Sequence, residues 1–414
     1  MKSFLLTTAF ITSSITISYA QQPTKSAFLK DNFSFAEKQL TGLTTIADKN
    51  DTLYPRTMDK AGNMKGTNKY DWTSGFFAGN LWYTYEYTKS EAIKKEALKW
   101  TESLEPVKYF HGHHDVGFMM YCSYGNAYRL TKKAAYKDVL VQTAKSLCTR
   151  FNTTVGCIKS WNDFRSMHGN AKYYFPVIID NMMNLELLFF ASKVTGDKTY
   201  KDIAIRHAET TMKNHLRKDY SSYHVVCYDT TNGKVLAQET AQGYSDNSMW
   251  ARGQSWGIYG FTVVYRETKD KRFLETARKM ADTFLDNANL PADKVPYWDF
   301  NAGQVGYEPS VNSKAKTNPL AHLRDASAAA ITSSALFELS TYLGKDGKKY
   351  YDAAELILHS LAGDAYRAKL NENANFILMH SVGSIPHGFE VDTPLVYADY
   401  YFLEALQRYN NLKK

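Results

Sequence analysis

Val194-Thr195-Gly196-Asp197-Lys198-Thr199-Tyr200 is a short polar turn between two runs of helical periodicity, and segments like it recur along the chain. The related turns are Tyr87–Ala92, Leu130–Tyr136, Glu267–Phe273 and Leu343–Tyr350. They carry Gly, Asp and Lys, which are typical of helix–helix connections. After each turn, an aromatic residue or Ala opens another run with helical periodicity. Self-similarity of this kind predicts stacked helical hairpins.

The apolar pattern predicts about twelve helices, and they fall into two kinds. Their approximate ranges are 32–46, 72–88, 90–105, 115–131, 133–151, 178–196, 198–216, 250–268, 270–288, 324–343, 348–362 and 392–411. The first helix of a pair is apolar and rich in small residues, as in 75–79 and 326–330, whereas the second is more charged, as in 92–97. Small residues allow close packing in an inner ring, and charged faces suit a solvated outer ring.

We therefore expect an all-α fold, an (α/α)6 barrel of six helical hairpins, with an open solenoid as the alternative. A short β-hairpin is expected between residues 223 and 240, where apolar and polar residues alternate around Thr231-Asn232-Gly233. The chain has 414 residues, of which 44% are hydrophobic and 22% charged, so it is long enough for a large core and is not disordered. We expect one catalytic domain over residues 21–414.

The first twenty residues are typical of a secretory signal peptide. Lys2 precedes a mildly apolar stretch over 4–17, and Ser18-Tyr19-Ala20 offers a cleavage site. The stretch is too short and too rich in Ser and Thr to span a membrane. We expect a periplasmic or secreted protein without membrane insertion. An oxidising compartment would permit a Cys148–Cys157 disulfide, although nothing in the spacing requires one.

The net charge is +8, but no long run of Lys and Arg occurs. That balance favours a weak general attraction for anions over a nucleic-acid-binding patch. The four cysteines show no C-x-x-C pair and no metal-ligand spacing, so no metal or cofactor is expected.

Long loops precede the inner helices, at 106–114, 152–177, 217–249, 289–323 and 363–391. In a closed barrel these loops share one end, where helix N-termini favour an anion. Many acidic, basic and aromatic residues lie in these loops or at the starts of the inner helices. They are Asp71, Trp72, His114, Asp115, Trp161, Arg165, His168, Asp180, His224, Gln242, Trp250, Arg252, Trp298, Arg324, Asp325 and Asp392. Acids, histidines, arginines and tryptophans without metal spacing indicate a sugar cleft. Asp71, Asp325 and Asp392 are predicted to be helix N-caps.

Asp115 and Asp180 each open a helical run and are preceded by aromatic residues. A carboxyl group beside apolar surface is a candidate for a raised pKa, which is how enzymes keep a general acid protonated near neutral pH. The alternative for each is a helix N-cap, a position at which Asp is preferred.

Four motifs occur in a fixed order and give a more specific indication. They are Asp71-Trp72-Thr73, His114-Asp115-Val116-Gly117-Phe118, Asp180-Asn181-Met182-Met183-Asn184 and Gln242-Gly243-Tyr244 followed by Trp250-Ala251-Arg252-Gly253-Gln254. Together they resemble the unsaturated glucuronyl hydrolases of glycoside hydrolase family 88. The resemblance implies an (α/α)6 barrel that needs no metal and degrades oligosaccharides left by polysaccharide lyases.

The same resemblance implies roles for individual residues. Asp180 would be the general acid/base and Asp115 its essential carboxylate neighbour, and His224, Gln242, Trp250 and Arg252 would contact the substrate. Members that prefer 6-sulfated sugars tend to carry Ser-x-x-Ser-x-Lys in a late loop, and this chain has Ser381-Val382-Gly383-Ser384-Ile385-Pro386 without the Lys.

The implied reaction is hydration of the C4=C5 double bond of a terminal unsaturated uronic acid. Partners would be unsaturated uronic-acid oligosaccharides, and the protein would be a monomer or a weak homo-oligomer. The alternatives are an unsaturated galacturonyl hydrolase acting on pectin fragments, a sugar epimerase or isomerase on the same barrel, and a non-catalytic sugar-binding protein.

Overall fold

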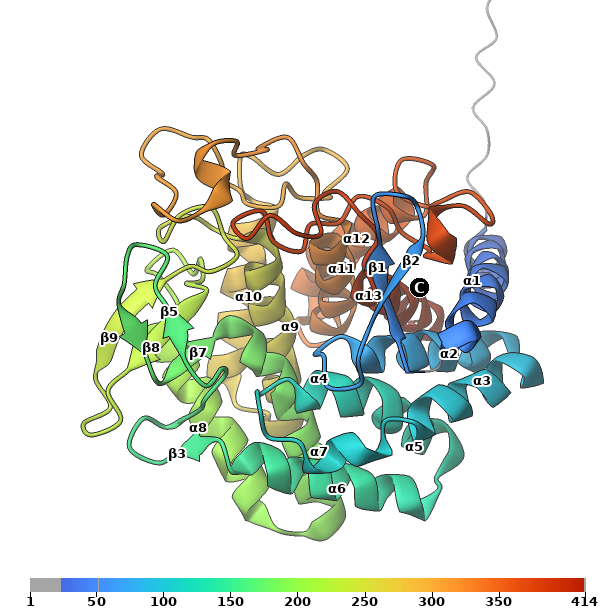
Figure 1. Cartoon of the computed structure of the whole chain (residues 1–414), viewed down its shortest axis with the longest axis horizontal. Helices are drawn as coiled ribbons and strands as arrows, with labels where there is room; N and C mark the ends of the chain where they lie inside the picture. The colour runs from blue at the N-terminus through green and yellow to red at the C-terminus, as the bar shows by residue number, and fades with distance from the viewer. Residues whose placement is uncertain (1–23, 51, 413–414) are drawn as a thin grey trace, which may run out of the picture.

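A computed structural model describes residues 24–50 and 52–412, and their helices form six hairpins closed into a ring (Figure 1). The predicted signal peptide, residues 1–20, lies outside the described residues. The inner positions are α2 (Ser74–Thr88), α4 (Val116–Met120) continuing through η3 (Tyr121–Gly125) and α5 (Asn126–Thr131), η4 (Ile179–Asn184) with α7 (Leu185–Thr195), α9 (Ala251–Thr268), α11 (Ala326–Ser340) and α13 (Val396–Asn411). Helix α13 packs against both α11 and α2, which closes the ring. The predicted (α/α)6 barrel is confirmed.

The outer positions surround this ring. They are α1 (Lys25–Ala47), α3 (Glu91–Glu102), α6 (Ala134–Cys148), α8 (Lys198–Asn214), α10 (Lys271–Leu285) and α12 (Gly347–Leu361). Helix α1 begins seven residues earlier than the expected 32, because Thr24 caps it and Phe28 and Leu29 are buried. It packs beside α2 and α13 and completes the sixth pair.

The inner helices are buried over more of their surface than the outer helices, as the composition predicted. Every residue from Ala251 to Val264 of α9 is buried, whereas α10 buries a single stripe. Small residues permit the close approach of inner helices: a Cβ at Gly75 of α2 would lie 1.9 Å from the Met119 carbonyl oxygen of α4. The inner ring therefore depends on glycine at its tightest crossing.

Four of the five recurring turns share one local structure; the fifth follows α11, which ends at Thr341 without a left-handed cap. Inner helices α2, α5, α7 and α9 end at a left-handed residue, with φ of 60° at Lys89, 56° at Lys132, 78° at Gly196 and 59° at Lys269. The preceding residue is Thr in all four, and its hydroxyl donates to the carbonyl four residues earlier at 2.7–2.9 Å. A left-handed residue ends a helix by turning the chain away from it, which explains why these segments join hairpins.

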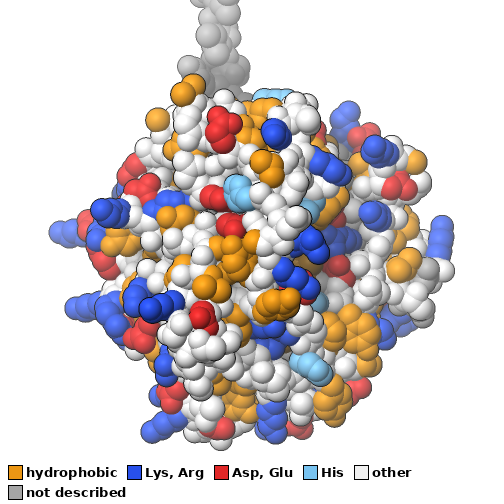
Figure 2. Space-filling model, turned by 60° about the vertical axis from the view of Figure 1, so that its left-hand side comes forward, with side chains coloured by type: hydrophobic (Ala, Val, Ile, Leu, Met, Phe, Trp, Pro, Cys, Tyr) orange, Lys and Arg blue, Asp and Glu red, His pale blue; other side chains and the backbone are white. Residues whose placement is uncertain are grey.

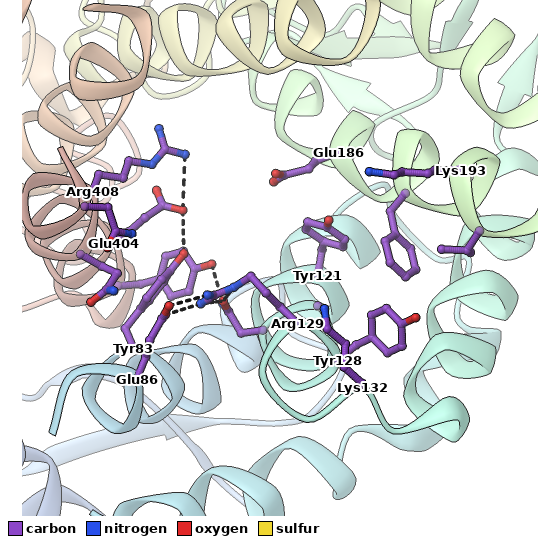
Figure 3. Close-up of a pocket in the computed structure, with 17 residues that line it drawn as sticks. Tyr83, Glu86, Tyr121, Tyr128, Arg129, Lys132, Glu186, Lys193, Glu404 and Arg408 are labelled. Carbon is purple, nitrogen blue, oxygen red and sulfur yellow. Dashed lines mark hydrogen bonds and ion pairs between the residues drawn. The ribbon is translucent and has the colours of Figure 1, made fainter. Parts of the chain in front are cut away.

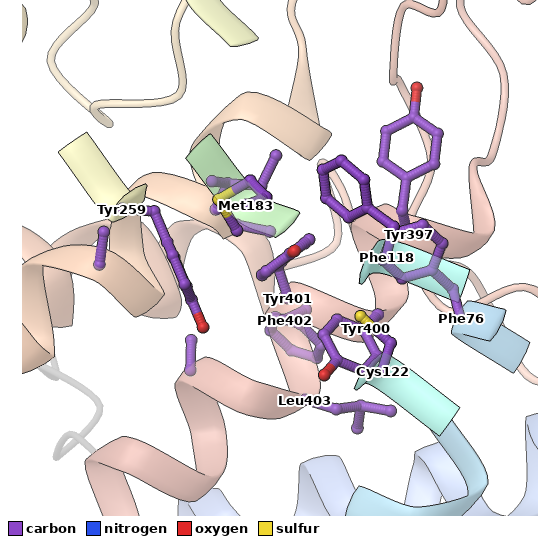
Figure 4. Close-up of a cluster of buried hydrophobic side chains, with 14 of the residues drawn as sticks. Phe76, Phe118, Cys122, Met183, Tyr259, Tyr397, Tyr400, Tyr401, Phe402 and Leu403 are labelled. Atoms are coloured by element: carbon purple, nitrogen blue, oxygen red, sulfur yellow. The ribbon is translucent and has the colours of Figure 1, made fainter. Parts of the chain in front are cut away.

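Aromatic side chains fill the middle of the barrel (Figure 4). Phe118 packs edge to face on Trp256 at 5.1 Å and near Phe76 at 5.7 Å between ring centroids. Phe76 in turn contacts Tyr400 at 5.3 Å. This packed layer separates the two ends of the barrel.

The short strands belong to the loops at one end. They are β1 (Tyr54–Met58) with β2 (Met64–Thr67), β3 (Phe151–Asn152) with β4 (Cys157–Ile158), β5 (Phe164–Arg165) with β6 (Lys172–Tyr173), and the sheet of β7 (Pro176–Ile178), β8 (Val225–Tyr228) and β9 (Val235–Glu239). Strands β8 and β9 pair antiparallel, which confirms the predicted hairpin. Short 3₁₀ turns are η1 (Asp48–Asn50), η2 (Glu105–Tyr109), η5 (Lys314–Lys316), η6 (Gly344–Asp346) and η7 (Asn373–Asn375).

Charges are spread over the surface. On the face drawn in Figure 2, Lys and Arg side chains are scattered among Asp and Glu. Over residues 24–50 and 52–412, no helix is both long and apolar enough to cross a membrane. All four cysteines are free thiols, so Cys148 and Cys157 are not bonded to each other.

Candidate active site

Asp180 lies in the first turn of η4, directly after strand β7. Strand β7 pairs with β8, with Ile178 opposite Val225, and this pairing brings Asp180 beside His224. Asp180 is 8% exposed, and its side chain makes no cap hydrogen bond, since Ile178 occupies the N-cap position of η4. The N-cap alternative is therefore wrong for Asp180.

Asp115 occupies the N-cap position of α4, yet its side chain caps nothing. Two histidines flank the carboxylate instead. His113 Nδ1 lies 3.0 Å from Oδ2, and His114 Nε2 lies 3.1 Å from Oδ1. The backbone of Asp115 starts the helix while its carboxylate is held by imidazole groups.

The two carboxyl groups differ in protonation. Burial raises the pKa of Asp180 to about 7, and the charge of Asp115 adds to the effect while Arg252 opposes it. Burial also acts on Asp115, but its contacts with His114 and His113 more than offset it and hold the pKa of Asp115 below its usual value. Near neutral pH, Asp115 is thus ionised and Asp180 is protonated in a large fraction of molecules.

His224 is held as a neutral donor. Its Nδ1 accepts hydrogen bonds from the backbone N–H groups of Ala241 and Gln242, both at 3.1 Å, so the ring proton is on Nε2. Burial lowers the pKa of His224 well below its ordinary value, which keeps the ring uncharged. Nε2 lies 3.7 Å from Asp180 Oδ2 and therefore directs an N–H group toward the carboxyl group.

His114 is fixed in a similar way by Asn184. The Asn184 Oδ1 accepts from the Phe118 N–H at 3.1 Å, which leaves Nδ2 to donate to His114 Nδ1 at 3.2 Å. Asn184 Nδ2 also donates to Asn181 Oδ1 at 3.2 Å. Since burial lowers the pKa of His114 to about 4, this neutral ring presents its Nε2–H to Asp115. Sequence reasoning missed Asn181 and Asn184, although two Asn three residues apart at an otherwise apolar helix start were a signal.

Arg252 and Trp250 support the site from α9. Arg252 is 1% exposed, and its guanidinium donates to Asp325 Oδ2 at 3.1 Å and to the carbonyl oxygens of Val382 and Gly383. It also lies 4.6 Å from the centre of the Trp250 ring. Arg252 thus ties α9 to the loop around 381–391, and its charge reaches Asp180.

Trp250, predicted to contact the substrate, is itself almost covered. Its side chain is 3% exposed, and its ring centre lies 4.5 Å from that of His224. Gln242 is half-buried, and its side chain forms no hydrogen bond within the described part of the chain. The structure therefore gathers the other five predicted site residues near Asp180, with Trp250 against His224 and Arg252.

Other predicted residues have separate partners. Asp325 caps α11 as expected, accepting from the Ser327 and Ala328 N–H groups. Asp392 is not a cap: α13 begins at Val396, and the Asp392 carboxylate lies 2.7 Å from His380 Nδ1. Asp71 is not one either, because it binds the N–H group of Thr73, which holds the N-cap position of α2.

Unused polar groups point to a ligand at Asp180. Of the buried polar atoms that lack a hydrogen-bond partner among the described residues, four lie at this site: Asp180 Oδ2, His224 Nε2, Trp256 Nε1 and His114 Nε2. Buried polar groups are nearly always paired, so these mark where a bound molecule supplies partners. Within 24–50 and 52–412, no three His, Cys, Asp or Glu side chains are placed to hold a metal ion. A protonated carboxyl beside an ionised one is suited to general acid catalysis.

Comparisons with known proteins show which family the chain resembles. The model of Glycosyl Hydrolase Family 88 matches residues 45–411. The chain is 46% identical over 362 residues to an unsaturated glucuronyl hydrolase of Formosa agariphila, covering 87% of this chain and 85% of the relative. It is 34% identical over 355 residues to an unsaturated glucuronyl hydrolase of Bacillus sp. (strain GL1), covering 83% and 89%.

Solved structures are similar over nearly the same extent. A crystal structure of an unsaturated glucuronyl hydrolase specific for heparin superposes with a TM-score of 0.83 at 46% identity, covering 92% of this chain and 96% of the other. An unsaturated glucuronyl hydrolase from Streptococcus agalactiae superposes with a TM-score of 0.81 at 31% identity, covering 95% and 94%.

Proposed function

The chain belongs to glycosyl hydrolase family 88, and we propose that it removes the 4,5-unsaturated uronic acid from the non-reducing end of oligosaccharides generated by lyases. One observation carries the proposal. Burial raises the pKa of Asp180 to about 7 beside Asp115, whose pKa is lowered by two histidines. This pair can protonate a weakly basic carbon and then accept a proton at the same site.

The first step is protonation of the substrate's enol ether. The C4=C5 bond of the unsaturated sugar is conjugated to the ring oxygen, so Asp180 in its acid form donates a proton to C4. The two electrons of the double bond form the new C4–H bond, and positive charge develops on C5 and the ring oxygen. Ionised Asp115 stabilises that charge, and the barrier falls because the carboxylate is already in place.

Water completes the hydration. Its oxygen bonds to C5 while the Asp180 carboxylate takes its proton, which restores the acid form. The hemiketal at C5 then opens to a ketone, and the former ring oxygen is left on C1 as a hydroxyl group. Loss of the aglycone from C1 leaves an aldehyde, so one water is consumed and one glycosidic bond is broken. A common glycosidase, by contrast, protonates the glycosidic oxygen.

The remaining residues position the sugar and the acid. The Nε2–H of His224 supplies a hydrogen bond to the uronate or to Asp180 at the reacting end. Gln242 offers a free amide to the sugar hydroxyls. Arg252 provides positive charge near the sugar carboxylate, although its donors already bind Asp325 and backbone carbonyls. Trp250 holds His224 and Arg252 in place.

Asp180→Asn tests the proposal. The amide has nearly the same shape but cannot donate a proton to carbon, so loss of the enoate ultraviolet absorbance should stop while the disaccharide still binds. The matched control is Asp202→Asn, which changes an exposed carboxylate on α8. Full turnover by Asp180→Asn would refute the role of this residue.

The proposed substrates are unsaturated glycosaminoglycan fragments with a glucuronyl-type end. The relatives are named unsaturated glucuronyl hydrolases or unsaturated chondroitin disaccharide hydrolases, which supports this choice over pectin-derived galacturonides. Parallel assays on unsaturated chondroitin, heparin and pectin disaccharides decide it. A preference for the pectin fragment would contradict the assignment.

We also propose export and a simple assembly. The sequence of residues 1–20 supports a cleavable signal peptide and a periplasmic or secreted enzyme. The enzyme would act as a monomer or weak homo-oligomer without binding nucleic acid, in keeping with the scattered charges. N-terminal sequencing of the exported protein and light scattering at two concentrations test these points.

A further inference from the structure

A second cavity lies at the opposite end of the barrel from Asp180. It has a volume of about 510 Å³ and is formed where the inner helices α2, α5, α7 and α13 end (Figure 3). Because the inner helices begin at the Asp180 end, the two sites are separated by the aromatic layer of Phe76, Phe118 and Tyr400. We call this space the far-end cavity.

One wall of the far-end cavity carries a network of paired charges. Glu404 is 7% exposed and accepts hydrogen bonds from Tyr83 at 2.8 Å and Tyr259 at 2.9 Å. Glu86 binds Arg129 through two hydrogen bonds of 2.6 and 2.5 Å. The Glu86–Arg129 pair is solvent-accessible, whereas Glu404 is a buried carboxylate. Packed apolar side chains would often stabilise a protein as well as a buried ion does, so stability alone does not account for Glu404.

The facing wall is aromatic and comes from α5, α7 and the π-helical turn η3. Phe190 lies 5.7 Å from Tyr121 and 5.5 Å from Tyr128 between ring centroids. Glu186 projects from the same wall, opposite Glu404, and is paired with Arg266 (Figure 3). A π turn inside a helix is uncommon and is frequent at functional sites.

Several polar groups of the cavity are unused. Gln407 is 8% exposed, and its buried amide oxygen has no hydrogen-bond partner among the described residues. The hydroxyls of Tyr121 and Tyr128 form no hydrogen bond there either, and Lys193 forms no ion pair within 24–50 and 52–412. Lys132 and Lys193 are both exposed at the mouth. The lining thus offers donors and acceptors to a molecule that enters.

The chemistry of the lining identifies the class of ligand. Aromatic faces pack on sugar rings, and carboxylate, guanidinium and amide groups bind vicinal hydroxyls in a few fixed directions. The deep charges are already paired with each other, so the deep part favours an uncharged ring. The two lysines at the mouth favour an acidic group on the next sugar. A volume of about 510 Å³ falls within the range of small-molecule sites.

We propose that the far-end cavity binds an acidic oligosaccharide, with an uncharged sugar ring inside it and the adjoining acidic sugar at Lys132 and Lys193. This accessory site holds the parent polysaccharide chain while the active site at Asp180 acts on the unsaturated ends of its fragments. The proposal does not depend on the reaction at Asp180.

The test uses a saturated hyaluronan tetrasaccharide, which alternates acidic and uncharged sugars and lacks the enoate that is hydrated. Hydrogen–deuterium exchange of the whole protein is compared with and without this probe. Protection is expected in residues 121–132, 186–195 and 404–411, at the far-end cavity. Protection confined to the catalytic loops, or none at all, would overturn the proposal.

Variants then measure the contribution of the unused groups. The double variant Lys193→Ala/Gln407→Leu should bind the tetrasaccharide about tenfold more weakly at the far-end cavity by calorimetry, with kcat/KM for an unsaturated disaccharide unchanged. Lys198→Ala is the control, since it removes an exposed lysine of α8 that does not line the cavity. Equal affinity of the double variant and the wild type would refute the assignment even if exchange had shown protection.

Discussion

Replacing Asp180 by Asn will change how the stability of the protein depends on pH, as well as stopping the reaction. Burial raises the pKa of Asp180 from 3.8 to about 7 in the folded protein. In the unfolded chain, the group titrates near its ordinary value. Between those two values the folded carboxyl keeps its proton while the unfolded one has lost it, and folding stability then falls as pH rises.

The direction of the change in folding stability with pH follows from the raised pKa of Asp180. The stabilisation from protonated Asp180 is fully present below the unfolded pKa and is lost as pH rises through the folded pKa. Each pKa unit corresponds to about 1.4 kcal/mol, so the wild type should lose about 3 kcal/mol from this group between about pH 4.5 and pH 7. Asn does not titrate, so the Asp180→Asn variant should not lose this stabilisation as the pH rises. Water entry and relaxation around the charge make this figure an upper limit.

The measurement is thermal unfolding of both proteins across that pH range. Unfolding entropy is about 2.1 cal/mol/K per residue, which for a chain of this length makes 3 kcal/mol equivalent to about 4 °C. The Tm of Asp180→Asn minus that of the wild type should therefore rise by about 4 °C up to about pH 7 and then level off. The exposed-site variant Asp202→Asn should show a flat difference. A flat difference for Asp180→Asn as well would refute the burial argument and, with it, the reason that Asp180 is an acid at neutral pH.

Three further predictions use the same geometry. Asp115→Asn should lower the pKa of Asp180, because the Asp115 charge helps to raise it, so the alkaline limb of the kcat/KM profile should move to lower pH as activity falls; a limb that stays in place contradicts the coupling. Asn184→Leu should reduce kcat about tenfold, because the hydrogen bond that fixes the His114 tautomer is lost, and should also lower Tm, because the Phe118 N–H loses its acceptor; unchanged kcat would count against that role. Gly75→Ala should destabilise the fold by about 1–3 kcal/mol in urea unfolding, since its Cβ would meet the backbone of Met119; wild-type stability would show that the crossing can relax.

The hairpin repeat could be predicted from sequence because its causes are local. The turn after four of the inner helices is set by a Thr and the left-handed residue that follows it, as at Thr195 and Gly196, and both are visible within a few positions. The number of hairpins favoured a closed ring but left an open solenoid as the alternative, and the packing of α13 against both α11 and α2 decides for closure. The start of α1 was missed because burial of Phe28 depends on α13 and α12, which are more than 300 residues away in sequence.

The residues that form the active site could be predicted, but the hydrogen bonds between them could not. Topology alone puts Asp115 and Asp180 at one end of the barrel, since both open inner helices. The role of Asn184 depends on which amide atom faces His114, and no spacing reveals that. Trp250 was expected to contact the substrate, yet it is 3% exposed, because His224 and Arg252 pack against its ring.

The division of labour between the two aspartates comes from their partners rather than from their depth. Asp115 and Asp180 are each 8% exposed, so burial penalises the charge of both to a similar degree. What distinguishes them is their neighbours: both oxygens of Asp115 lie within 3.1 Å of an imidazole nitrogen, whereas Asp180 Oδ2 has no partner among the described residues. The contacts with His114 and His113 hold the pKa of Asp115 below its usual value, whereas burial dominates at Asp180 and leaves it a proton and an oxygen open to the substrate. The two histidines thus also act on the acid indirectly, because they keep Asp115 charged and that charge adds to the raised pKa of Asp180.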